Sequence, residues 1–211
     1  MMRIDSVSAQ PDRVGRYKVT FEDGKSMRLY RQTIETFGIY SGKELDDDEY
    51  NQLNKAAGEM SAKMRAVRII SASSVSKSDL ERRLIQKGET AANAGKAVDW
   101  LTEMDVLDDR KTAEDIVSRC IAKGYGINRA KQALYEKRIP KEYWDAVLDD
   151  YPDQTEQIVK FLRSRLGTDW GDKELRRTMD ALVRRGYNYS EIRQGLHILS
   201  LNEEFLEETY E

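Results

Sequence analysis

The stretch 173–199 predicts two amphipathic helices joined by a tight turn, and it constrains the fold more than any other part of the sequence. Apolar residues recur at i, i+4 and i+7 before the turn, and the same spacing returns after it: Leu175, Met179 and Leu182, then Ile192, Leu196 and Leu199. We therefore expect each of the two helices to bury one face.

The turn at Gly186 has the residues that a helix end and a helix start require. Glycine just past a helix can adopt the left-handed conformation, and Tyr187 can then pack back onto Leu182. Asn188 and Glu191 have the spacing of a capping box, which predicts that the next helix starts at once.

The same helix, glycine, helix unit occurs twice more. Gly88 and Gly124 each follow a lysine at the predicted end of an amphipathic helix, and another helix follows each of them. In the downstream helices a small or branched residue precedes a leucine by four: Ala97 and Leu101, Ala130 and Leu134, Ile192 and Leu196. The glycines are 36 and then 62 residues apart, so the module recurs with variable spacers. From residue 46 onward we predict nine helices, or three sets of three.

The composition agrees with such an array. Of the 211 residues, 39% are hydrophobic, which is enough to bury a core, while 35% are charged and predict an extensive solvated surface. We predict a mainly α fold, an elongated array of tandem three-helix repeats with a small N-terminal β-hairpin. The predicted divisions are a hairpin with a short helix at 1–45, repeats at 46–107, 108–151 and 152–201, and an acidic tail at 202–211.

The first 45 residues differ from the rest. Apolar residues alternate with a period near two on both sides of Asp23-Gly24, which predicts a β-hairpin, with a third strand around Ile4–Ser8. A short helix over 32–40 is expected to stop at Ser41-Gly42.

Paired capping residues mark the starts of several later helices. Asp46 and Glu49 predict a capping box for a long helix, Ser76 with Asp79 caps the next, and Asp153 with Glu156 caps a later one. The long helix has an apolar stripe that steps by three and four, which fits a coiled coil and a packing helix of an array equally well.

No constellation of residues indicates catalysis. His197, the only histidine, has no evident cysteine or serine partner, and Cys120, the only cysteine, lies on an apolar helix face. Phosphate-binding glycine motifs are absent from the sequence, and the acidic run 46–49 lacks the spacing of a calcium loop. We expect a protein that acts by binding, with no catalytic residues, metal site or cofactor.

Two features of the sequence predict a cytoplasmic protein. Its N-terminus lacks the apolar core of a signal peptide, and no run approaches the roughly 20 apolar residues of a membrane span.

Charge is distributed unevenly although its net value is only −3. Residues 61–90 carry seven Lys or Arg against three acids, whereas 201–211 carry five Glu and no cation. The candidate binding residues lie near the three turns: Arg82, Arg83 and Lys87; Lys123, Arg129 and Lys131; Arg184 and Arg185. A solvated helix face is the ordinary explanation of such runs, and Lys87, Lys123 and Arg185 equally fit complements of the helix dipole.

Four blocks, in this order, resemble the RecX regulatory proteins of bacteria: SKSDLERRLIQKG at 76–88, LDDRKTAEDIV at 107–117, KGYG at 123–126, and the stretch 173–196 with its RRGY. The resemblance covers roughly residues 60 to 200. Thr112, Ala130 and Arg138 depart from the family, which usually has an aromatic residue, an isoleucine and often a glycine at these positions.

The resemblance implies tandem three-helix repeats that lodge in the groove of the RecA recombinase filament on DNA. RecX-like proteins modulate the recombinase, usually by inhibiting its ATPase and strand exchange, within DNA repair, recombination and the SOS response. The implied partners are the RecA filament and single- or double-stranded DNA, and the expected form is a monomer. The alternative is a generic helical scaffold or a direct DNA-binding protein, because paired helices with a tight turn also enter major grooves. An enzyme of unknown type is the third alternative.

Overall fold

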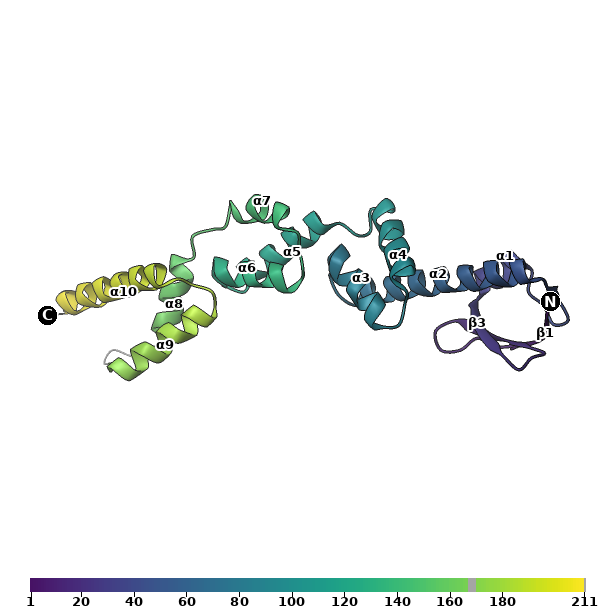
Figure 1. The fold of residues 1–211 in the computed structure, drawn as a ribbon. Helices are drawn as coiled ribbons and strands as arrows, with labels where there is room; N and C mark the ends of the chain where they lie inside the picture. Colours follow the sequence, from purple (N-terminus) through teal and green to yellow (C-terminus); the bar gives the residue numbers. More distant parts are fainter. Residues whose placement is uncertain (167–169, 211) are drawn as a thin grey trace. The chain divides into compact units, whose positions relative to one another are not determined.

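The structure is a computed structural model that describes residues 1–166 and 170–210, the last ten of these by their backbone alone (Figure 1). The chain divides into two compact units, Met1–Leu107 and Asp108–Glu211.

An antiparallel sheet of four strands opens the first unit. Its strands are β1 (Met2–Val7), β2 (Arg16–Phe21), β3 (Ser26–Tyr30) and β4 (Glu44–Leu45), in the order β3-β2-β1-β4. The hairpin predicted at Asp23-Gly24 is confirmed as β2 and β3, and Gly24 has the positive φ of 80° that its turn requires. The expected third strand is β1, whereas β4 was not predicted, because two residues are too few to show a period.

The helix α1 (Arg31–Phe37) follows the sheet. The predicted stop at Ser41-Gly42 is wrong, because Gly38 already takes the left-handed conformation, with φ 56°, and donates its N–H to the carbonyl oxygen of Glu35.

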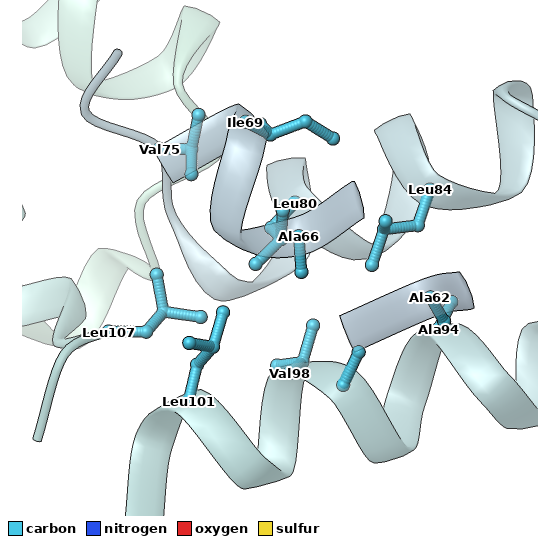
Figure 2. Close-up of a cluster of buried hydrophobic side chains, with 11 residues drawn as sticks. Ala62, Ala66, Ile69, Val75, Leu80, Leu84, Ala94, Val98, Leu101 and Leu107 are labelled. Atoms are coloured by element: carbon cyan, nitrogen blue, oxygen red, sulfur yellow. The ribbon is translucent and has the colours of Figure 1, made fainter. Parts of the chain in front are cut away.

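The long helix α2 (Asp47–Ala72) contacts both the sheet and the pair α3 (Lys77–Gln86) and α4 (Ala91–Glu103) (Figure 1). Its capping box of Asp46 and Glu49 is confirmed, with both hydrogen bonds present. The small side chains Ala62 and Ala66 of α2 are fully buried and let the three helices share one core (Figure 2). The apolar stripe of α2 is therefore a packing face, not a coiled-coil seam.

The second unit contains the remaining helices: α5 (Asp109–Ala122), α6 (Ile127–Glu136), a 3-10 turn η1 (Lys141–Tyr143), α7 (Trp144–Leu148), α8 (Thr155–Arg165), α9 (Asp172–Arg184) and α10 (Tyr189–Tyr210). One apolar core joins α5, α6 and α7, and another joins α8, α9 and α10. In the described part of the chain nine α-helices follow residue 46, as predicted, and the mainly α fold with a small N-terminal sheet is confirmed. The division into three repeats stays a prediction, and the side chains of the predicted tail 202–211 lie outside the description.

The turn between α9 and α10 has the predicted geometry. Gly186 has φ 94°, and the Tyr187 N–H donates to the carbonyl oxygen of Leu182 at 3.2 Å. Asn188 and Glu191 form both bonds of the capping box. All three helix–glycine–helix turns have this left-handed glycine, since Gly88 and Gly124 have φ 93° and 62°.

Of the other two predicted caps, one is confirmed and one is wrong. Ser76 accepts the N–H of Asp79 at 3.1 Å, as expected. At α8 the cap position falls on Gln154, and Asp153 instead accepts the Thr155 N–H at 2.9 Å from one residue further out. None of the described helices combines the length and apolar character needed to cross a membrane.

Candidate functional site

Two pockets, one in each unit, gather basic side chains, and each contains some of the candidate residues. We name them the turn pocket, in the second unit, and the sheet pocket, in the first. Arg83 and Lys87 lie in the sheet pocket, and Lys123 and Arg185 lie in the turn pocket.

The turn pocket has a volume of about 320 Å³ and lies where the end of α5 meets α8 and the end of α9. Lys160 of α8 joins Lys123 and Arg185 there, so three cations line it, and none of the three pairs with a carboxylate among the described residues. Its lining residues are Ile121, Ala122, Lys123, Gly124, Gln157, Lys160, Phe161, Ser164, Arg185 and Tyr187.

Backbone contacts between two glycine turns build this pocket. The Gly126 N–H donates to the carbonyl oxygen of Arg185 at 2.9 Å, and the Asn128 N–H donates to that of Gly186 at 3.2 Å. The buried Tyr187 hydroxyl donates to the carbonyl oxygen of Gly124 at 2.7 Å. These bonds bring Lys123 beside Arg185 although the two are far apart in sequence.

Aromatic rings hold the Arg185 side chain in place. Its guanidinium carbon lies 4.8 Å from the ring centre of Phe161 and 5.9 Å from that of Tyr125, within the range of cation–π attraction. A guanidinium stacked on rings keeps its N–H donors at the edge, where they can meet an anion.

The sheet pocket is larger, about 500 Å³, and lies between the sheet and the helices α2 and α3. Five cations line it: Arg16 from the sheet, Arg65 and Arg68 from α2, and Arg83 and Lys87 from the end of α3. The other lining residues are Val14, Tyr30, Ser61, Ile69, Ala72 and Ser73, so no carboxylate lines the pocket.

Three of these arginines are paired with carboxylates that lie outside the lining. Arg16 pairs with Asp12 at 2.8 Å, Arg65 with Glu89 at 2.9 Å, and Arg83 with Asp79 at 2.8 Å: Asp12, Glu89 and Asp79 fix the three guanidinium groups. Asp12 accepts backbone and side-chain hydrogen bonds from Arg16, which lower its pKa to about 2.

Arg68 is held differently, by neutral acceptors. It donates to the Tyr30 hydroxyl at 2.6 Å and to the carbonyl oxygen of Met64 at 3.0 Å. Neither Arg68 nor Lys87 forms an ion pair with any carboxylate that the structure describes. The positive charges of these two side chains therefore remain uncompensated in the pocket.

Asp79 is the buried centre of a charge cluster at the start of α3. Its side chain is 2% exposed and pairs with Arg82 at 2.6 Å as well as with Arg83. Burial opposes ionisation, but the hydrogen bond from Arg82 and the charge of Arg83 outweigh it and hold the pKa of Asp79 below its usual value. Arg82 also donates to Gln86 and does not line the pocket, so its contacts serve the fold of α3.

The remaining candidates are not brought together with these groups. Arg129 pairs with Glu136 at 3.4 Å, and Lys131 and Arg184 are exposed and line neither pocket.

Four cations of the pockets were not predicted from the sequence: Arg16, Arg65, Arg68 and Lys160. The i, i+3 spacing of Arg65 and Arg68 within the basic stretch 61–90 was the available signal. Arg16 enters the pocket only because the sheet packs on α2, and such a contact leaves no local pattern.

The single histidine and the single cysteine of the sequence line neither pocket. His197 is exposed, and Cys120 is buried, which raises the pKa of its thiol. Within the described residues no group of three or more His, Cys, Asp or Glu side chains is arranged to hold a metal ion.

This chain is similar in sequence and in fold to proteins named regulatory protein RecX. The regulatory protein RecX of Mycolicibacterium smegmatis is 32% identical over 170 residues, which cover 76% of this chain and 87% of that protein. The chain belongs to the RecX family. RecX of Vibrio parahaemolyticus is 26% identical over 145 residues, covering 67% of this chain and 94% of its own length. A scan against models of known protein families gives no match.

Solved RecX structures share the fold of this family member. A crystal structure of regulatory protein RecX matches 92% of this chain and 98% of its own, with a TM-score of 0.61 and 21% identity. RecX from Lactobacillus salivarius matches 69% of this chain and 99% of its own, with a TM-score of 0.60 and 20% identity. The RecX relatives are named regulatory proteins, which agrees with a regulatory role for this chain.

Proposed function

We propose that this RecX-family protein binds the RecA filament on DNA and inhibits its ATP hydrolysis and strand exchange. Membership of the RecX family carries the proposal. It acts as a non-enzymatic regulator, as a monomer in the cytoplasm, within recombination and the SOS response.

The proposed contact surface consists of the candidate cations near the glycine turns, with the turn pocket as its best-defined part. Lys123, Lys160 and Arg185 present three cations that no described carboxylate neutralises. A filament of recombinase on DNA offers phosphates and acidic side chains, and such charges attract an unneutralised basic surface over roughly 10 Å at moderate salt.

The decisive experiment measures RecA ATPase on single-stranded DNA with increasing amounts of this protein, together with co-sedimentation. We expect the rate to fall as the protein saturates the filament. An unchanged rate at saturation, with no co-sedimentation, would refute the proposal.

Charge variants locate the surface. Lys123→Gln/Lys160→Gln should weaken co-sedimentation and flatten its salt dependence, because two charge contacts are lost. The matched control is Arg110→Gln/Lys141→Gln, which removes two exposed cations of the same unit outside the pocket. Equal behaviour of the two variants would place the contact elsewhere.

The alternative of direct DNA binding makes a different prediction in the same assay. Naked duplex would then bind as tightly as the filament does. That result would make DNA the primary partner and the recombinase a secondary one.

A further inference from the structure

The sheet pocket differs from an ordinary basic surface because its cations come from three separate elements and surround one cavity. Arg16 belongs to the sheet, Arg65 and Arg68 to α2, and Arg83 and Lys87 to the end of α3. Like charges repel, and Arg68 and Lys87 have no carboxylate partner among the described residues, so a bound anion would stabilise this arrangement. We infer that this pocket is a phosphate-binding site that takes two adjacent phosphate groups.

The residual positive charge of the pocket indicates how much negative charge the expected ligand carries. Asp12, Glu89 and Asp79 neutralise three of the five cations from outside the lining, which leaves the charges of Arg68 and Lys87. Two residual positive charges match two singly charged phosphodiesters of a strand, and the paired arginines beside them can accept the additional charge of a free diphosphate. A volume of about 500 Å³ admits such a group but not a duplex.

The four arginines of the pocket are held by protein partners before any ligand arrives. Carboxylates hold Arg16, Arg65 and Arg83, and the hydroxyl of the buried Tyr30 holds Arg68 at 2.6 Å. Guanidinium groups with restricted rotation lose little entropy on binding, and their planar N–H donors suit the paired oxygens of phosphate.

Phosphate fits the lining better than a cation does. The polar groups of the lining, apart from the cations, are the hydroxyls of Tyr30, Ser61 and Ser73, and the pocket walls carry no carboxylate that would repel an anion. The apolar part of the lining consists of Val14, Ile69 and Ala72 beside the ring of Tyr30.

All lining residues of the site belong to the unit that contains the sheet, so phosphate can bind there without the recombinase. The phosphate site and the proposed filament binding can therefore fail separately.

The test titrates the full-length protein with two probes, pyrophosphate by calorimetry and a short labelled oligothymidylate by fluorescence anisotropy across a salt series. The variant Arg68→Gln/Lys87→Gln should bind at least tenfold more weakly. With the oligonucleotide, its log–log salt slope should be smaller by about 1.4, since each contact with a single strand contributes about 0.7.

The matched control is Arg28→Gln/Lys55→Gln, which removes two exposed cations from β3 and α2 outside the pocket and should bind like the parent. A second variant, Arg68→Lys, separates charge from folding because it keeps the cation. It should retain most of the affinity that a single Arg68→Gln variant, made for comparison, loses. Thermal unfolding checks that every variant is folded.

Each outcome decides the inference. Weakened binding of both probes supports a site for strand phosphates, and weakened binding of pyrophosphate alone supports a site for a free diphosphate. Parent-like binding by Arg68→Gln/Lys87→Gln, or no binding of either probe to the parent, overturns the inference. Loss of filament binding in this variant with parent-like binding of both probes also overturns it, because the pocket would then contact protein.

Discussion

The carbonyl oxygen of Gly186 lies 2.3 Å from the position that a Cβ on Gly126 would occupy. In the opposite direction, a Cβ on Gly186 would lie 2.3 Å from the backbone nitrogen of Arg129. Both obstacles are backbone atoms, which cannot rotate away. The two turns can therefore meet only because neither residue has a side chain.

Gly126→Ala should lower the free energy of unfolding of the second unit by about 2 kcal/mol or more, the usual cost of overpacking. The φ of Gly126 is −75°, which alanine tolerates, so the main cause is the contact with the backbone of Gly186 and Tyr187, and the loss of glycine at the N-cap of α6 adds to it. Urea unfolding of the full-length chain measures the change. The control is Gly95→Ala in α4, where a Cβ would meet open space. This substitution should raise the free energy of unfolding by about 0.5–1 kcal/mol, because alanine favours the helix over glycine. Equal stability of Gly126→Ala and the parent would show that the turns separate easily.

Arg138→Gly should stabilise the protein by about 0.5 kcal/mol. Arg138 has φ 55°, a left-handed conformation that costs a side-chain-bearing residue about 1–2 kcal/mol, and the greater freedom of glycine in the unfolded chain offsets part of the gain. Arg138→Ala retains the strain and serves as the control for loss of the side chain. Thermal unfolding distinguishes the two, and a higher melting temperature for alanine than for glycine would contradict the explanation.

Asp79→Asn should destabilise the first unit by about 2 kcal/mol, because Arg82 and Arg83 lose a buried counterion. The pKa of Asp79 is held below its ordinary 3.8, so its contribution is present above that value and is lost as pH falls through the lower folded-state pKa. Stability measured from pH 7 down to pH 2 should thus depend less on pH in Asp79→Asn. The exposed Asp99→Asn should resemble the parent throughout.

Tyr151→Phe should show a pH effect of the opposite sign. The Tyr151 hydroxyl donates to the carbonyl oxygen of Tyr125 at 2.6 Å, and burial raises its pKa from 10.0 to about 12. At pH 7 the variant should lose about 1 kcal/mol with that hydrogen bond. The parent keeps its contribution below pH 10 and loses it as pH rises toward 12, so the difference between the two proteins should shrink there. Chemical denaturation at pH 7, 10 and 11.5 measures it, and a difference that grows with pH would refute the role of Tyr151.

Features encoded within a few residues could be predicted from the sequence. The left-handed glycines at 88, 124 and 186 and the capping box of Asp46 and Glu49 depend on neighbours along the chain, and the structure confirms them. The end of α1 was placed too late because Gly38 competes with Gly42 as a stop, and both have positive φ.

The pockets depend on contacts between distant residues, which is why the sequence revealed only part of them. Arg83 and Lys87 were expected from their place before a turn, whereas Arg16 and Arg68 meet them through the packing of the sheet on α2. The bond from Arg68 to Tyr30 spans 38 residues and has no local signature.

The bond between the Gly126 amide and the Arg185 carbonyl also gives the second unit a built-in reporter of its motions. That amide can exchange its hydrogen with solvent only while the two turns are apart. Its exchange rate, followed in deuterated water, therefore reports the fraction of time for which the end of α9 is separated from the start of α6, with no label added to the chain.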